Sequence, residues 1–103
     1  MSDLHTVNKS PFEKNSLDTC LKLSRAGSSI LLLEDGVYAA LAGTAVEGLV
    51  SSALAADKKV YALSPDLKAR GLGGSNLIDG VELVDYAGFV DLAESNDKVQ
   101  AWV

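Results

Sequence analysis

Four short apolar runs, separated by polar and glycine-containing segments, divide the chain. They cover residues 4–7, 29–33, 60–63 and 81–84. The second and third runs are nearly continuous in Leu, Ile, Val and Ala, whereas a strand with one face in water alternates apolar and polar residues. Continuous runs are typical of parallel sheets, because helices cover both faces of such sheets. The four runs therefore predict four strands of a mainly parallel sheet.

The segment after the first run predicts a helix that begins at Asn15 or Ser16 and ends near Arg25. Asn and Ser are favoured N-cap residues, and Gly27 can end the helix in the left-handed conformation. Apolar and small residues recur at the i, i+3, i+4, i+7 spacing of one helix face. The residues expected on the inward face are Leu17, Cys20, Leu21 and Ser24.

A second helix is expected after the run at 29–33. Thr44 with Glu47 three residues later has the pattern of a capping box, in which each side chain satisfies a free backbone N–H of the first turn. A short helical turn over residues 37–41, broken at Gly43, is expected before this helix. The apolar stripe of the second helix consists of Val46, Leu49, Val50, Ala53 and Leu54.

Two further helices are expected after the third and fourth runs, and the first of them is brief. Ser64 has the character of a cap, Pro65 suits the first helical position, and Gly71 ends the segment. The last helix is expected to begin at Asp85. It is expected to carry one apolar face formed by Tyr86, Phe89, Val90 and Ala93. Residues 99–103 predict a short edge strand or a docking tail.

Strands that alternate with helices at these spacings imply right-handed βαβ crossovers. The fold class predicted is α/β: a single-domain, three-layer, open and mostly parallel sheet with helices on both faces, of the flavodoxin-like type. At 103 residues, the length of the chain suits one domain over residues 1–103.

Composition and charge narrow the classes of function. Hydrophobic residues make up 48% of the chain, which is high for a short soluble protein and suggests that a partner covers part of its surface. The net charge is −5, which argues against a face that binds nucleic acid directly. The longest strongly apolar run, residues 30–33, is too short to cross a bilayer. With a single Cys and no leader-like segment, we expect a cytoplasmic protein.

The carboxyl ends of the predicted strands are where ligands collect in open α/β sheets. The loops there are residues 8–15, 34–36 and 64–66, together with Asp85. Ser64, Asp85 and the pair Asp35–Gly36 each suit a cap or turn, and we favour that interpretation over catalysis. Glu34 beside Asp35 is a weak metal signal, because adjacent residues rarely converge on one ion. We therefore expect neither a metal nor a cofactor.

Two further side chains are candidates for chemistry. His5 lies in the first predicted strand, where a core or interface imidazole is favoured over a catalytic base. Cys20, the only thiol, lies early in its helix, where the helix dipole favours a thiolate slightly. A buried structural role is favoured for Cys20 on its pattern, because unpaired Cys is among the most buried residue types. A Cys–His pair stays open, although the two residues are expected at opposite ends of a βα unit.

The chain resembles the DsrH/TusB family over nearly its whole length. The stretches that carry the resemblance are LHTVNKSPF (4–12), LLLEDGVYAA (31–40), VYALSPDLKARG (60–71), VDYAGFV (84–90) and the dipeptide at 101–102. None of these stretches is a catalytic signature, and the match depends on their order and spacing.

The resemblance implies a subunit of a heteromeric sulfurtransferase complex that relays persulfide sulfur. The implied partners are DsrE/TusD-like and DsrF/TusC-like sister subunits, arranged as a heterohexamer of two heterotrimers, and a small sulfur-carrier protein of the DsrC/TusE type. The principal persulfide cysteine belongs to the DsrE/TusD subunit, which leaves this type of chain a supporting role or, through Cys20, an accessory carrier role.

A thiol at this helix position resembles the sulfur-oxidising DsrH branch, so intracellular sulfur oxidation is the favoured function. The alternative is the TusB branch, which serves 2-thiolation of the tRNA wobble uridine. An alternative of another class is a stand-alone flavodoxin-like domain that binds a small molecule.

Overall fold

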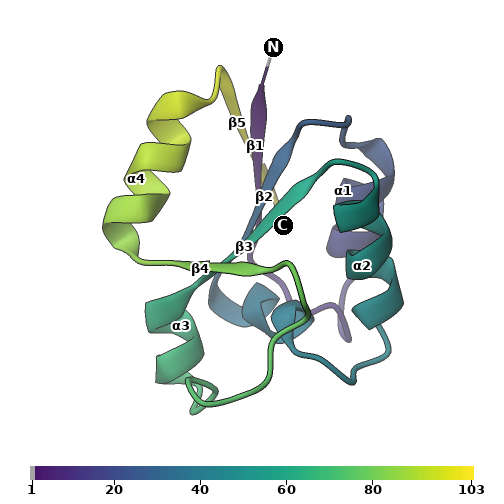
Figure 1. The fold of residues 1–103 in the computed structure, drawn as a ribbon, viewed down its shortest axis with the longest axis vertical. Coiled ribbons are helices and arrows are strands. Elements are labelled where there is room, and N and C mark those ends of the chain that lie inside the picture. The colour runs from purple at the N-terminus through teal and green to yellow at the C-terminus, as the bar shows by residue number, and fades with distance from the viewer. Residues whose placement is uncertain (1) are drawn as a thin grey trace.

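Five parallel strands form one sheet in the computed structural model, which describes residues 2–103 (Figure 1). The sheet order is β4-β3-β2-β1-β5, so the chain fills one side of β1 first and then returns to its other side. The strands are β1 (Asp3–Val7), β2 (Ser29–Leu32), β3 (Lys59–Leu63), β4 (Glu82–Val84) and β5 (Lys98–Trp102). The four predicted strands are confirmed, and β5 confirms the predicted edge strand.

Helices connect the strands in the order expected of βαβ units. The α-helices are α1 (Ser16–Leu23), α2 (Glu47–Ala55), α3 (Ser64–Ala69) and α4 (Tyr86–Ser95). A 3₁₀ helix, η1 (Glu34–Ala40), follows β2 and confirms the helical turn predicted near residues 37–41. The predicted α/β class is therefore confirmed.

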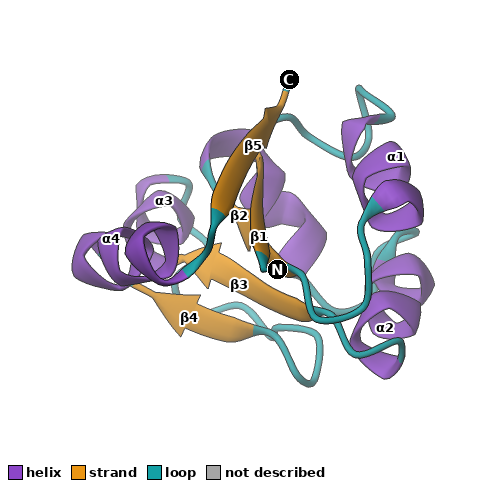
Figure 2. Cartoon of the chain, turned by 90° about the horizontal axis from the view of Figure 1, so that it is seen from above, coloured by secondary structure: helices purple, strands orange, loops and turns teal. Residues whose placement is uncertain are grey.

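One face of the sheet is covered by α1 and α2, and the larger part of the core lies there (Figure 2). Every residue of β2 is buried, as the continuous apolar run predicted. All four residues predicted on the inward face of α1 are buried: Leu17, Cys20, Leu21 and Ser24. In α2, Val50 and Ala53 are buried and the rest of the predicted stripe packs beside them.

The other face of the sheet is covered by α4 (Figure 2). Leu4, Leu31 and Leu63 form a smaller core there. None of the residues of α4 is fully buried, although three of its side chains pack against this core: Phe89, Leu92 and Ala93. The two faces of the sheet are therefore covered unequally.

Two predicted helix starts are wrong in detail. α2 begins at Glu47 instead of Thr44, because residues 44–46 form a separate turn in which the Thr44 hydroxyl accepts a hydrogen bond from the Val46 N–H. The Glu47 carboxylate accepts from the N–H of Gly43 at 2.6 Å, so it holds the turn before the helix. Ser64 is the first helical residue of α3 and not its cap, since Leu63 occupies the N-cap position.

The predicted apolar face of α4 is wrong for half of its members. Phe89 and Ala93 face the sheet as expected, whereas Tyr86 and Val90 are exposed. Asp85 is confirmed as the N-cap, because its carboxylate accepts a hydrogen bond from the Gly88 N–H at 2.8 Å.

Candidate functional site

The polar loops at the carboxyl ends of β2 and β3 are tied to each other. The Asp66 carboxylate accepts a hydrogen bond from the N–H of Glu34 at 2.6 Å. The Arg70 guanidinium pairs with the Asp35 carboxylate at 3.0 Å. These contacts join η1 to α3, so the polar residues predicted at this edge serve chiefly to hold two loops together.

Gly36 lies against the end of β1. A Cβ atom at this position would meet the carbonyl oxygen of Val7 at 2.1 Å, far inside van der Waals contact. The same carbonyl accepts a hydrogen bond from the N–H of Leu33. The start of η1 is therefore fixed against β1 by a contact that no residue other than glycine can make.

A cavity of ≈ 340 Å³ lies between the loop after β1 and η1. Its lining is Ser10, Phe12, Glu13, Asp35 and Tyr38. The volume is near the lower end of small-molecule sites, which run from about 300 to 1,000 Å³. Two hydroxyls, two carboxylates and two aromatic rings can hold a small polar group there, but the lining contains no thiol that could carry sulfur.

The weak metal signal of Glu34 and Asp35 has no geometric support. Asp35 is paired with Arg70, and the Glu34 N–H is bonded to another loop. Among residues 2–103, no group of three or more His, Cys, Asp or Glu side chains is placed to hold a metal ion. In the same part of the chain, no helix is long and apolar enough to cross a membrane.

Cys20 lies inside the core between α1 and the sheet. Its side chain is fully buried, and it packs within the larger apolar cluster. Burial raises the pKa of the Cys20 thiol to about 12, and the charge of Lys58 offsets this only in part. The thiol is therefore protonated at neutral pH, whereas sulfur transfer needs an accessible thiolate. The accessory carrier role of Cys20 stays a prediction.

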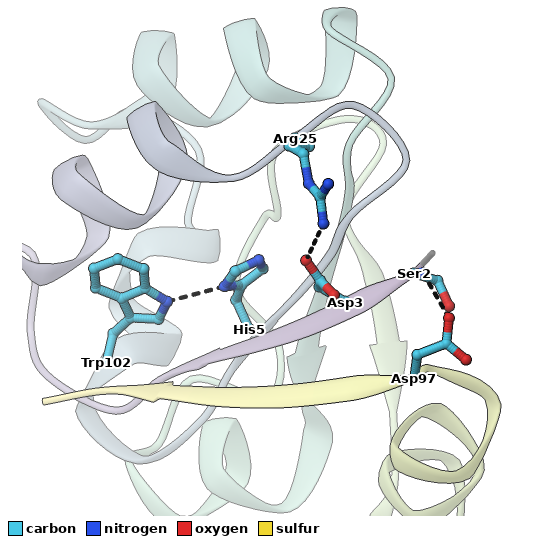
Figure 3. A network of polar contacts seen from close by, with 6 residues as sticks. All are labelled: Ser2, Asp3, His5, Arg25, Asp97 and Trp102. Carbon is cyan, nitrogen blue, oxygen red and sulfur yellow. Dashed lines mark hydrogen bonds and ion pairs between the residues drawn. The ribbon is translucent and has the colours of Figure 1, made fainter.

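His5 forms a polar contact with the last strand. The indole N–H of Trp102 donates a hydrogen bond to Nδ1 of His5 at 3.0 Å (Figure 3). An accepting Nδ1 means that neutral His5 carries its proton on Nε2. That atom is buried and has no hydrogen-bond partner among residues 2–103.

The His5 contact has electrostatic consequences. Burial lowers the pKa of His5, the Asp3 carboxylate raises it in part, and the charge of Lys58 lowers it further. Asp3 is itself held by Arg25 at 3.2 Å (Figure 3). The interpretation of His5 as a core imidazole agrees with this burial, and within residues 2–103 no hydrogen bond joins it to Cys20. The role of Trp102 was missed, because the sequence does not reveal which strand pairs with β1.

Comparison with protein families and relatives gives a consistent result. The family profile described as DsrH like protein matches residues 9–99. Protein TusB of Escherichia coli (strain K12) is 39% identical over 100 residues, which is 96% of this chain and 99% of that protein. Protein TusB of Pectobacterium parmentieri is 38% identical over 99 residues, again 96% of this chain and 99% of that protein.

Solved structures with the same fold are also found. The ychN protein from E. coli has a TM-score of 0.85 at 24% identity, covering 99% of this chain and 100% of that one. Protein MTH1491 from Methanobacterium thermoautotrophicum, described as of unknown function, has a TM-score of 0.75 at 18% identity, with 96% and 97% covered. At these identities the likeness supports the fold alone.

Proposed function

The chain belongs to the DsrH/TusB family, and from this premise we propose that it is a TusB-type subunit of a sulfur relay that serves 2-thiolation of the tRNA wobble uridine. The observation that carries the proposal is the match to proteins called TusB over almost the full length of both chains. The preference for sulfur oxidation rested on Cys20, and the relatives favour the alternative, tRNA thiolation, over it.

The proposed partners are sister subunits of the TusC and TusD types and a sulfur carrier of the TusE type. An assembly of this kind suits a chain whose apolar fraction is 48% and whose surface exposes large apolar side chains such as Tyr86 and Val90. The proposal includes a cytoplasmic location and the heterohexamer that the family resemblance implies.

We further propose that this chain positions its partners and does not carry sulfur itself. Sulfane sulfur moves when a thiolate attacks the outer sulfur of a persulfide. The donor S–S bond breaks, a new S–S bond forms on the acceptor, and the donor cysteine leaves as a thiolate. Cys20 is fully buried and its pKa is raised to about 12, which does not suit it to be either the attacking or the leaving group.

The experiment is complementation of a bacterium that lacks its own TusB, with 2-thiouridine in tRNA measured by mass spectrometry. We expect this chain to restore the modified nucleoside when it is expressed with its sister subunits. The Cys20→Ala variant should restore it to a similar level, because the thiol is buried and protonated. A chain that assembles with its sisters but restores no 2-thiouridine would contradict the thiolation proposal.

A second variant separates the thiol from its packing. Cys20→Ser also removes the thiol but introduces a hydroxyl into an apolar site, which costs about 1–3 kcal/mol when the hydroxyl finds no partner. If both variants stay folded and both lose 2-thiouridine formation, Cys20 is a carrier and the purely positioning role is wrong. A loss limited to Cys20→Ser reports destabilisation instead.

Sulfur oxidation is kept as the second candidate because of one observation, the presence of a thiol at position 20. It predicts that the chain supports oxidation of stored sulfur in a sulfur bacterium that lacks its own DsrH, and that Cys20→Ala abolishes this activity. Restoration of 2-thiouridine without any effect on sulfur oxidation would exclude it.

A further inference from the structure

One face of the sheet is left open along β5. The core on this face is formed by Leu4 and its neighbours, and α4 covers it. In β5, Val99 pairs with Leu4 and Ala101 pairs with Thr6. Directly paired residues of parallel strands project to the same face, so Val99 and Ala101 lie on the face that α4 covers. Both are nevertheless exposed, because the cluster under α4 takes residues from β1 to β4 and none from β5.

The flank of α4 that borders this uncovered area is also apolar. Successive residues of a helix are 100° apart, which places Tyr86 and Val90 beside the inward row that contains Phe89 and Ala93. α4 runs antiparallel to the strands (Figure 1). In a right-handed helix that runs in this direction, the residues about 60–100° beyond the inward row, Tyr86 and Val90, lie on the side nearer β5. These two side chains are 60% and 53% exposed.

Together these residues form one surface, which we call the open face. Its members are Thr6, Tyr86, Val90, Val99 and Ala101. In three-layer α/β domains, further helices usually cover this position. Here a tyrosine and two valines, each at least half exposed, surround an area of sheet that no segment of residues 2–103 covers. An apolar area of this kind is typical of an interaction site.

The charge around the open face indicates what binds it. Residues 85–97, which comprise α4 and the residues that flank it, contain four acidic residues and no Lys or Arg. The whole chain has 9 basic and 14 acidic residues, so the remaining residues hold 9 basic and 10 acidic ones, a net charge of −1. The negative charge of the molecule is therefore concentrated in the segment that borders the open face, and Asp91 and Glu94 lie on α4 itself.

This charge pattern decides between occupants. A second copy docked through the same face would bring two such acidic segments together, which is unfavourable. Nucleic acids and anionic membranes are repelled for the same reason. A different protein chain with apolar side chains edged by Lys or Arg complements both the apolar and the acidic parts of the surface.

We propose that the open face is the docking surface for a sister subunit that presents an apolar ridge edged by basic residues. The inference rests on the proposed function, since it assumes that the chain works inside a heteromeric complex. It adds which face makes the contact and which chemistry the partner brings.

The test is co-expression with TusC- and TusD-type subunits from the same genome, with an affinity tag on the TusD-type chain. Val90→Lys and Val99→Lys each remove an apolar contact and place a positive charge before a basic partner. We expect each to weaken retention of this chain by about tenfold or more, as for central interface residues. Leu23→Lys is the matched control, because Leu23 is 69% exposed on α1, across the sheet from α4.

The charge argument is tested separately. Asp91→Asn with Glu94→Gln should weaken retention and reduce its dependence on salt, since screening is nearly complete at about 1 M, where the Debye length is about 3 Å. Circular dichroism and thermal unfolding of each purified variant check that it remains folded.

Each outcome separates the inference from the proposed function. If the wild-type chain and the open-face variants are retained equally, the inference about the docking surface is wrong, whereas the proposed complex is supported. If Leu23→Lys alone is lost, the partner binds the α1 side. If the wild-type chain is not retained by any sister subunit, the proposed function itself fails. If the variants instead abolish self-association of the isolated chain, the occupant is a second copy and the inference is overturned.

Discussion

At the scale of single residues, Gly36 decides how the carboxyl edge of the sheet is built. Its place against the Val7 carbonyl lets η1 begin directly at the end of β2 and brings Asp35 within reach of Arg70. The sequence suggested a turn or cap for the pair Asp35–Gly36, which accounts for the turn but not for the close approach. The close approach of Gly36 to Val7 requires β1 to lie beside the start of η1, and the sequence does not show which strand lies there.

Gly36→Ala should destabilise the protein. The added Cβ would lie 2.1 Å from a backbone oxygen, which cannot rotate away as a side chain would, so β1 or η1 must move. Overpacking of this kind costs about 1–3 kcal/mol or more, and urea unfolding followed by circular dichroism measures it. Gly48→Ala is the matched control, because a Cβ at Gly48 meets no atom within 4 Å and alanine favours the helix by up to about 1 kcal/mol. Equal stability of the two variants would contradict the close contact.

At the scale of secondary-structure elements, β5 depends on β1 and on one side chain. Four of the five residues of β5 are exposed, and Trp102 is its half-buried member. The bond from the Trp102 indole to His5 therefore supplements the backbone pairing of β5 with β1. Protonation of His5 converts Nδ1 from an acceptor to a donor, which removes this bond and leaves a charged imidazole buried.

Acid should destabilise the protein through His5. The pKa of His5 is lowered in the folded state, so between that value and the unfolded value of about 6.5 the unfolded chain binds more protons. Stability is therefore full above about pH 6.5 and decreases as the pH falls toward the folded pKa. The groups that act on His5 are Asp3 and Lys58, and Asp3 is tied to Arg25.

The measurement uses Trp102, the single tryptophan of the chain, as a local fluorescent probe. Between pH 7.5 and pH 5 its emission should shift as β5 loosens, and the free energy of unfolding should decrease. In His5→Phe the difference between the two pH values should be smaller, which separates His5 from carboxylates that titrate lower. If the free energy of unfolding depends on pH in the same way in the wild type and in His5→Phe, the coupling between His5 protonation and stability is ruled out.

The strands and helices were largely predictable from the sequence, but the side of each helix that stays exposed was harder to predict. β2 and β3 were identified because burial on both faces leaves a continuous apolar run, and the inward face of α1 followed from its period. In α4, Tyr86 and Val90 fit the same period as Phe89, but only the sheet decides which side of an apolar helix is covered. The caps predicted at Thr44 and Ser64 are wrong by two residues and one residue, since local hydrogen bonds compete with the start of a helix.

At the scale of the whole molecule, apolar burial and charge are both distributed unevenly. The face under α1 and α2 contains most of the buried residues, whereas the face under α4 has a small core and an open apolar border. The acidic segment 85–97 lies on the second side, so the side with the smaller core also carries most of the net negative charge. Both features are expected of a side that the proposed partner stabilises.

Binding of the sister subunits should therefore stabilise one side of the molecule more than the other. A partner present at 100 times its dissociation constant adds about 2.7 kcal/mol to the folded state. In hydrogen exchange followed by mass spectrometry, we expect peptides from α4 and β5 to gain protection in the complex. Peptides from α1 and α2 should change much less, because their buried residues are already protected in the isolated chain. Protection gained over α1 and α2 but not over α4 and β5 would place the contact on the opposite side, and the uneven burial would then be a property of the isolated fold rather than a sign of where the partner binds.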